Sequence, residues 1–503
     1  MKKIILLYIL AVGMIACTGQ NTPDEPGTGG TDTTTVSPGD TTITTTDTIR
    51  ITWNSASAVI EGTHADVTVS EDKGYVTVNS TVKDITYILS GEGQGQLTIY
   101  GTNRHQLILN NLTLTCSDGP AINNQCKKSC FVVLEGTNSL TDGSSYASSD
   151  EDRKAAFFSE GQMIFSGGGS LTVLGNYKHA LASDDYIQFA ASTGSLTLNA
   201  SADGIHANDG IYFEGGGFII NAGNDGVQCD SIIIVNDGAL SITATDKGIT
   251  DSLGITINGG TIRISSKYKC IKTKADLTIN DGDIEVVCTG SASYNNSPEG
   301  IEAKGDLTIN GGFVYSQSAD DAINSGGELI INGGHVCAYS TGNDGIDANG
   351  NCYIKGGLVY AIGANSPEMG IDANTEKNYT LYVQGGTLVA IGGLERGASL
   401  TQNCYSTSSW SKNTWYALTV GSDVFAFKTP SSGGSTLVVS GATQPTLAKS
   451  VTASGTAIFK GMGYYPASYS GGSSVSLSSY SASSGGGPGG GGGHGGGGGP
   501  WGW

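Results

Sequence analysis

The sequence is poor in charge, in long apolar runs and in helix-forming segments, and each shortage excludes a class of protein. Charged residues make up 14% of the 503 residues, and the formal net charge is −20. Such a chain repels nucleic acid and anionic lipid, so neither is expected as a partner. Beyond the amino terminus, no apolar run is long enough to span a bilayer. No amphipathic helical period is present, which excludes a helical bundle.

Cysteine and histidine form no recognisable zinc or hydrolase motif. Nine cysteines follow Cys17, at irregular spacing and without a CxxC pair. Three of them lie close together and could supply one disulfide: Cys116, Cys126 and Cys130. Five others fall inside strand patterns and are expected to be small packed residues: Cys229, Cys270, Cys288, Cys337 and Cys352. The six histidines are scattered, and no glycine-rich stretch opens a helix after a strand, so nucleotide binding is not indicated.

The amino terminus predicts export. Lys2 and Lys3 precede a short apolar run over residues 4–12, and residues 14–17 read Met-Ile-Ala-Cys. This pattern predicts a lipoprotein signal peptide over residues 1–17, with Cys17 lipidated. An ordinary signal peptide with an incidental cysteine is the alternative. We therefore expect a cell-envelope lipoprotein, in the outer membrane or at the cell surface, that touches the membrane only through its lipid.

The segments next to both ends are compositionally biased. Residues 18–48 are rich in Thr, Asp, Pro and Gly, which predicts a flexible tether. Residues 481–503 are nearly all Gly and Ser and are expected to form a disordered tail. More than 400 residues lie between the two segments, enough for a large core.

An internal repeat of about 22 residues organises this middle part. Short apolar strands end in an Asn-Gly-Gly or Asn-Asp-Gly corner, as in residues 255–260, 277–282, 307–312 and 329–334. Successive strand starts, from Ile211 to Leu381, are separated by 22, 22, 22, 30, 22, 23 and 29 residues. A second column, which contains Asp203-Gly-Ile and Asp225-Gly-Val, keeps nearly the same steps. Two columns that share one period predict a repeat architecture.

Each repeat holds about three short strands separated by Gly, Asn and Asp corners. Such a unit buries its apolar face only by stacking on the next one. The sequence therefore predicts an all-β, single-stranded parallel β-helix over residues 107–393. Residues 49–106 are expected to form a β cap and residues 394–480 a small C-terminal β module. An extra loop around Tyr294 accounts for the step of 30 residues.

The corners of the later repeats carry acidic and amide side chains that stacking would bring together. They are Glu299, Glu302, Asp320, Asp321, Asn324, Asp344, Asp347 and Asp372. Carboxylates at this density repel one another unless a cation neutralises them, and the flexible coordination of Ca²⁺ suits an irregular oxygen cage. Calcium is therefore the expected cofactor. The alternative is that these residues only shape the corners, with Asn ladders along the stack.

Two lysines interrupt the acidic column. Lys247 and Lys269 lie between Asp225 and Glu299 in the aligned repeats. A lysine with a lowered pKa could abstract the C5 proton of a uronate, the step that a polysaccharide lyase requires. The alternative is simple alternation of charge along the column, in which carboxylates keep both lysines protonated.

Outward aromatic residues follow the Gly-Gly corners. Phe313, Tyr315 and Tyr360 are candidates for stacking on sugar rings, since the two tyrosines are two coils apart, or about 10 Å. They could equally be ordinary strand residues, and the C-terminal module could cover them.

Four motifs together resemble a known family. They are Leu107-Ile-Leu-Asn-Asn111, Glu299-Gly-Ile-Glu302-Ala, Asp320-Asp-Ala-Ile-Asn324 and Asn343-Asp-Gly-Ile-Asp347. This set is similar to the secreted β-helical carbohydrate-binding proteins whose fold is like that of the family nine pectate lyases. The resemblance covers about residues 50–393. It implies a right-handed β-helix, bound calcium at the acidic corners, and affinity for polygalacturonate and related plant polysaccharides.

Three functions are compatible with these observations. The favoured one is a monomeric lipoprotein that binds an acidic, pectin-like plant polysaccharide with calcium. A calcium-dependent lyase that uses Lys247 or Lys269 as its base is the second. The third is an adhesin or envelope spacer, because a lipid-anchored solenoid with a tether could act as a stalk.

Overall fold

A computed structural model describes residues 43–45, 47–293 and 295–482. The predicted signal peptide with Cys17, most of the predicted tether and nearly all of the predicted tail lie outside the described residues. The described residues belong to one compact unit. They contain β-strands, two short 3₁₀ turns and no α-helix. None of their helical segments has the length and apolar character needed to cross a membrane.

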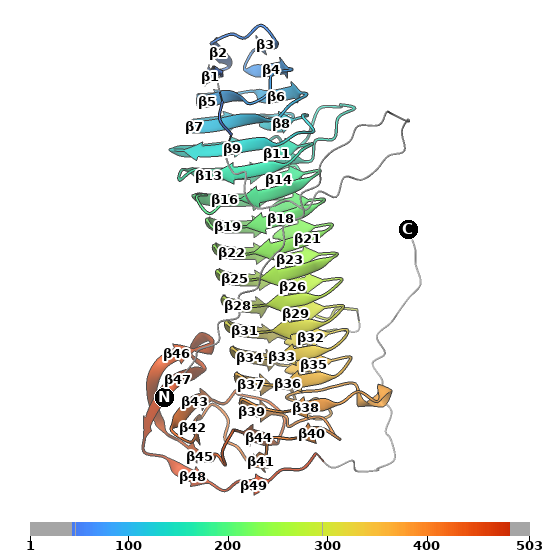
Figure 1. Ribbon diagram of the computed structural model, residues 1–503, viewed down its shortest axis with the longest axis vertical. Helices are drawn as coiled ribbons and strands as arrows, with labels where there is room; N and C mark the ends of the chain where they lie inside the picture. Colours follow the sequence, from blue (N-terminus) through green and yellow to red (C-terminus); the bar gives the residue numbers. More distant parts are fainter. Residues whose placement is uncertain (1–42, 46, 294, 483–503) are drawn as a thin grey trace, which may run out of the picture. The chain divides into compact units, whose positions relative to one another are not determined.

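The main body is a parallel β-solenoid of about 12 turns, which confirms the predicted fold class (Figure 1). One coil consists of β26 (Lys269–Thr273), β27 (Leu277–Ile279) and β28 (Asp283–Cys288). Each strand pairs in parallel with its counterpart in the next coil, as β26 does with β29 (Glu299–Ala303). Three strand columns therefore run along the stack.

The first column forms a separate 13-stranded sheet, here called sheet B. After β6 (Gln96–Gly101), and besides β26 and β29, it contains β8 (Ile122–Asn124), β11 (Ala155–Ser159), β14 (His179–Ser183), β17 (Ile205–Ala207), β20 (Val227–Cys229), β23 (Lys247–Asp251), β32 (Ile323–Ser325) and β35 (Ile346–Ala348). Isolated bridges continue it through Ile371 to Leu394. The candidate site lies on the outward side of sheet B.

Each strand of the third column is followed along the chain by a turn and then by a segment of sheet B. It contains β13 (Ser170–Gly175), β16 (Ser195–Ala200), β19 (Gly217–Ala222), β22 (Ala239–Ala244), β25 (Thr261–Ser266), β28, β31 (Phe313–Ser318), β34 (His335–Ser340) and β37 (Leu358–Ile362). The second column includes β24 (Gly254–Ile257), β27, β30 (Leu307–Ile309), β33 (Leu329–Ile331), β36 (Cys352–Ile354) and β38 (Leu381–Val383).

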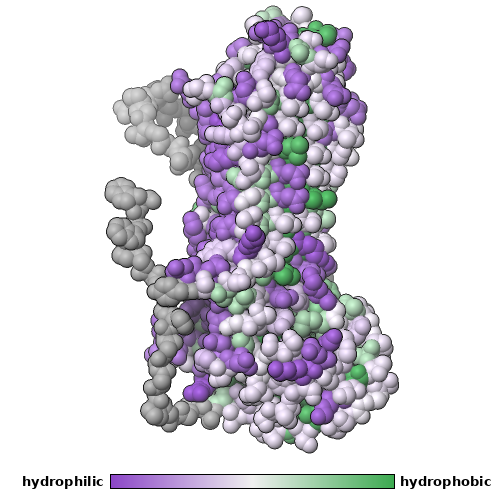
Figure 2. Space-filling view, turned by 180° about the vertical axis from the view of Figure 1, so that it is seen from behind, coloured by the Kyte–Doolittle hydropathy of each residue, from purple (hydrophilic) through white to green (hydrophobic). Residues whose placement is uncertain are grey.

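Inward aliphatic residues in register form the core. Leu277, Leu307 and Leu329 pair across neighbouring coils, and each is fully buried. Full burial of one such side chain is worth about 1.5–3 kcal/mol. Because side chains alternate across a strand, the same register places the polar residues outward. Figure 2 shows the result on one side of the stack, where hydrophilic and neutral residues dominate and hydrophobic ones are scattered.

The Asn-Gly-Gly corners are explained by two local requirements. Asn Nδ2 donates to Asn Oδ1 of the preceding coil at 2.7 to 2.8 Å through Asn236, Asn258, Asn280, Asn310 and Asn332. The last corner residue has a positive φ, 87° at Gly260, where a Cβ would lie 2.7 Å from a backbone oxygen. At these corners, the predicted asparagine ladder is present.

The parallel stack begins earlier than the predicted boundary at residue 107. β1 (Thr48–Ser55) pairs in parallel with β5 (Ile85–Gln94). Two antiparallel hairpins close this end: β1 pairs with β2 (Ser57–Glu61), and β3 (Val67–Asp72) pairs with β4 (Tyr75–Ser80). Residues 49–106 therefore supply the first coils as well as the cap.

A small antiparallel sheet packs beside the last coils, which confirms the predicted C-terminal β module (Figure 1). Its strands are β42 (Trp415–Val420), β43 (Asp423–Lys428), β45 (Thr446–Lys449), β46 (Thr452–Ile458), β47 (Gly463–Ser470) and β48 (Ser473–Val475). A second hydrophobic core joins it to β31, β34 and β37.

The predicted disulfide among Cys116, Cys126 and Cys130 is wrong. All nine cysteines after Cys17 are free and buried. The Cys116 thiol faces Asp118 at 3.5 Å and the Cys126 thiol faces the Asn103 carbonyl at 3.3 Å, so the sulfurs have separate polar partners. The five cysteines predicted to be packed strand residues are buried, as expected.

Candidate functional site

The turns before sheet B and its outward positions form one charged face along the stack. In the register of sheet B, Lys247 lies beside Lys269, and Lys269 lies beside Glu299. Three residues further along the strands of sheet B, Glu302 lies between Lys272 and Asn324 of the neighbouring coils. Sequence spacing alone would not show how the charges on this face pair.

The middle of the charged face is a lysine cluster in which amines neutralise the carboxylates. Lys269 Nζ lies 2.6 Å from Glu299 Oε2 and 3.1 Å from Glu302 Oε2. Lys272 Nζ lies 3.6 Å from Glu302, and Lys304 also forms an ion pair with Glu302. Glu299 and Glu302 were predicted as calcium ligands, but here both pair with Lys269. Burial still raises the pKa of Glu299 to about 8, whereas Lys269 and Lys304 overcome burial at Glu302 and bring its pKa below the ordinary value.

The two lysines predicted as alternative bases are poorly suited to that role. Burial alone would lower the pKa of Lys269, but Glu299 and Glu302 raise it above its ordinary value. Burial alone would also lower the pKa of Lys247, but Asp246 and Asp225 raise it above its ordinary value. Both amines therefore remain protonated at neutral pH and cannot accept a proton.

The C-terminal end of the charged face carries an acidic cluster. It is formed by Asp321, Asp344, Asp347 and Asp372. Carboxylate oxygens of Asp344, Asp347 and Asp372 lie within 4.8 Å of one another. In the described part of the chain, no Lys, Arg or His forms a salt bridge with any of the four. Predicted ligands from two successive coils therefore do come together.

Two amide side chains complete this end of the face. Asn324 Nδ2 donates to Asp321 Oδ2 at 2.9 Å and to Asp347 Oδ2 at 3.2 Å. Asn343 Nδ2 donates to Asp320 Oδ1 at 2.7 Å. Asn324 turns its Nδ2, and not its oxygen, toward Asp321 and Asp347, so the hard-oxygen ligands that the cluster offers calcium are the carboxylates.

The acidic cluster is electrostatically unfavourable when all its carboxylates are ionised. Burial, assisted by the neighbouring carboxylates, raises the pKa of Asp347 to about 6, of Asp344 to about 8 and of Asp372 to about 10. The pKa of Asp321 is raised well above its usual value for the same reasons. Either protons or a cation must balance this charge. Its donor atoms and its lack of counterions fit calcium.

A histidine pair at the opposite end of the face was not identified from the sequence. His179 Nδ1 and His206 Nδ1 lie 3.2 and 3.1 Å from the same oxygen, Asp203 Oδ2, and the rings stack at 4.5 Å. Burial alone would raise the pKa of Asp203, but the two imidazoles bring it below its usual value. The repeat offered a signal, because His206 follows Asp203 by three residues, as Glu302 follows Glu299.

The predicted sugar-stacking platform is wrong for Tyr315 and Tyr360. Their exposed fractions are 5% and 0%, because the C-terminal module covers this face. Tyr360 Oη donates to the Lys428 carbonyl at 3.0 Å, and its ring lies 5.3 Å from that of Phe427. Phe313 is 44% exposed, but its ring lies against His335, which in turn contacts Tyr465 of the C-terminal module.

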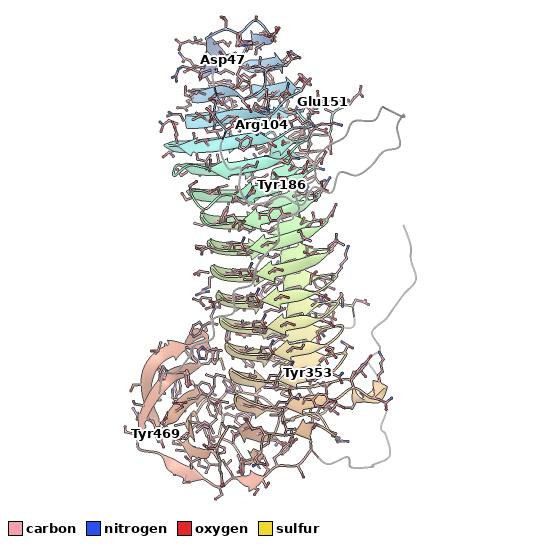
Figure 3. The ribbon with its side chains drawn as sticks, viewed as in Figure 1. Asp47, Arg104, Glu151, Tyr186, Tyr353 and Tyr469 are labelled. Atoms are coloured by element: carbon pink, nitrogen blue, oxygen red, sulfur yellow. The ribbon has the colours of Figure 1, made fainter. Side chains whose placement is uncertain are left out.

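A different aromatic pair occupies the outward side of the second column. Tyr353 in β36 stacks on Tyr382 in β38, with ring centroids 4.9 Å apart and an interplanar angle of 6°. Figure 3 shows Tyr353 on the last coils, whereas Tyr469 lies on the C-terminal module. The two rings face each other, so each covers one face of its partner.

Comparison with known proteins identifies the family. The model of the family described as carbohydrate-binding domain-containing proteins matches residues 72–345, more than half of the chain. The chain belongs to this family. The prediction of a carbohydrate-binding family is confirmed, and the partner of this carbohydrate-binding protein is a polysaccharide in the general sense.

Other comparisons add little. A solved structure of a polysaccharide lyase-like protein from C. thermocellum is 21% identical, and the match covers 52% of this chain and 96% of that one, with a TM-score of 0.39. No curated protein matches the sequence.

The lysine cluster yields a stability prediction. Lys269→Met leaves the buried Glu299 without its counterion and removes one of the three lysines that pair with Glu302, so we expect a loss of about 3–5 kcal/mol of stability. Thermal unfolding followed by circular dichroism measures it as a lower melting temperature. Lys274→Met, at an exposed position of the same coil, is the matched control.

Replacing all three groups together should restore much of this loss. The triple variant Lys269→Met, Glu299→Gln, Glu302→Gln removes the unpaired charges, which are the cause of the expected destabilisation. A Lys269→Met protein that melts like the wild type would show that the ion pairs do not matter to the fold.

Proposed function

We propose that this protein binds acidic, pectin-like polysaccharide through calcium held at the acidic cluster. The family supports polysaccharide binding, and the buried carboxylates without counterions support a cation. Calcium, when bound, supplies positive charge that both the protein and a uronate carboxylate can share. Without it, the net charge of −20 would oppose a polyanionic ligand.

The observation that carries this proposal is the contrast between the two halves of the charged face. Where Lys269 is present, the carboxylates are neutralised, and no further cation is needed. Beyond Asp320 there is no lysine in register, yet the carboxylates continue. Asp344, Asp347 and Asp372 are therefore the proposed calcium ligands, with Asp321 and Asn324 beside them.

The extra loop before β29 lies next to this proposed site. Asp320 N donates to the Pro298 carbonyl at 3.2 Å, which attaches the end of the loop to the acidic corner. Inserted loops on one face of a solenoid commonly contribute to ligand binding. The loop is thus in position to contact a chain bound at the acidic cluster.

A lyase activity would need a neutral amine near the substrate. The carboxylates that raise the pKa of Lys247 and Lys269 oppose this, and Lys272, whose pKa is lowered by burial, is held in an ion pair with Glu302. Binding without cleavage is therefore the better-supported proposal. A spacer role without any glycan ligand is the third possibility, but membership of a carbohydrate-binding family does not favour it.

The calcium proposal is tested by thermal unfolding with and without the metal. Calcium at 100 times its Kd should stabilise the wild type by about 2.7 kcal/mol, and EDTA should reverse the effect. Asp344→Asn with Asp347→Asn should abolish this response. The same variant should melt higher than the wild type in EDTA, because it removes like-charge repulsion.

Asp237→Asn with Asp281→Asn is the matched control, since both aspartates are exposed corner residues of another column. It should keep the full calcium response and calcium-dependent retention on polygalacturonate. A wild type that is insensitive to calcium and EDTA would rule out the cation site. A calcium-dependent rise in ultraviolet absorbance, lost in Lys269→Met, would instead indicate β-elimination.

We also propose that a lipid on Cys17 anchors the chain in the cell envelope, as its amino-terminal sequence indicates. Cys17→Ala should leave the precursor unprocessed or release the protein from the membrane fraction. Cell fractionation with lipid labelling measures this. Unchanged attachment and labelling in the variant would exclude the anchor.

A further inference from the structure

A groove runs along the stack between the third strand column and sheet B. Its volume is about 580 Å³, and its lining residues come from β13, β16, β19, β22 and β25 and from the turn after β28. At about 4.8 Å per coil, this distance is about 24 Å. The groove is therefore long and narrow, in the direction in which a polymer chain would lie.

Small residues create the floor of the groove. Gly175, Ala200, Ala222 and Ala244 are in register at the ends of their strands, and all four line it. Ala222 and Ala244 also belong to the hydrophobic core, and a Cβ at Gly175 would meet the His179 carbonyl oxygen at 2.4 Å. On four successive coils, the floor therefore consists of backbone and small residues, one Gly and three Ala, where the chain turns toward sheet B.

Hydrogen-bonding side chains form the wall. Asn199, Asn221, Thr243 and Ser265 are in register on the outward side, one residue before the floor positions. Asn221 Nδ2 donates to Asn199 Oδ1 at 3.0 Å. Two amides and two hydroxyls have more donors and acceptors than this one bond uses, so the wall can bind several hydroxyl groups.

The groove carries almost no charge. Lys267 is the one charged residue that lines it, and no carboxylate does. A densely ionised polymer could pair with only one cation there, and this would not offset the free-energy cost of removing water from its other charged groups. The lining suits a chain of uncharged sugar units, and the spacing of the wall residues is close to the rise of one pyranose in an extended 1,4-linked chain.

The groove lies inside the part of the chain that matches the family model. All lining residues lie between Leu174 and Thr289, well inside the matched range 72–345, whereas Asp347 and Asp372 lie beyond it.

We propose that the groove binds an extended, uncharged 1,4-linked polysaccharide segment, such as methyl-esterified polygalacturonate, without calcium. This rests on the proposed function, in which ionised units of the same kind of polymer bind calcium at the acidic cluster. A partly esterified chain therefore contacts both surfaces. Its hydroxyl groups bind in the groove, and its free carboxylates bind the metal.

Two polymers and two variants test this division. Binding of highly methyl-esterified pectin and of polygalacturonate is measured by affinity electrophoresis, in EDTA and in calcium. The groove variant Asn221→Leu with Thr243→Leu changes two exposed wall residues. Thr256→Leu with Thr278→Leu, at outward positions of β24 and β27, is the matched control.

In EDTA, the wild type and the control should bind methyl-esterified pectin, and the groove variant should bind it about tenfold more weakly, a loss of about 1.4 kcal/mol. The calcium-induced rise in melting temperature should be unchanged in the groove variant, which shows that it is folded. Equal binding by the groove variant and the wild type would overturn the assignment. Wild-type binding to polygalacturonate in calcium, with none to esterified pectin in EDTA, would overturn the groove but not the calcium site; binding to neither would overturn both.

Discussion

In-register parallel stacking is the constraint on which the rest of this structure depends. Each coil places its residues one strand spacing from the equivalent residues of its neighbours, so every column must be internally compatible. Aliphatic columns such as Leu277, Leu307 and Leu329 satisfy this by burial, and asparagine columns by hydrogen bonds. A column of charged residues satisfies it when opposite charges pair, when carboxylates are protonated or when a cation is bound.

The charged face combines both solutions. Lys269 holds Glu299 and Glu302 through two short ion pairs in a nearly buried setting. Three coils further, Asp344 and Asp347 face Asp372 without any amine among the described residues. Parallel pairing continues from β29 through β32 to β35, and an isolated bridge extends it to Ile371. The two regions therefore differ chiefly in whether lysines pair with the carboxylates.

The repeat allowed the coils, the corners and the acidic column to be predicted, because all three depend on local sequence at a fixed period. It could not show that the C-terminal module covers Tyr315 and Tyr360, since that packing joins segments with no common period. The pairing of Lys269 with Glu302 was also hidden, because it depends on which side chains reach across one strand spacing.

The groove was missed for a related reason. Ala200 and Ala222 look like ordinary strand ends, and their significance lies in being small on successive coils beside a polar wall. Likewise, spacing could not distinguish the free cysteines from a possible disulfide, because it does not show that the Cys126 thiol faces the Asn103 carbonyl, 23 residues earlier in the chain.

The most direct test of the account is to locate calcium in crystals by anomalous diffraction. The account predicts a peak bounded by Asp344, Asp347 and Asp372, with none at Glu299 and Glu302. Absence of a peak at saturating calcium, or a peak within the lysine cluster, would contradict it.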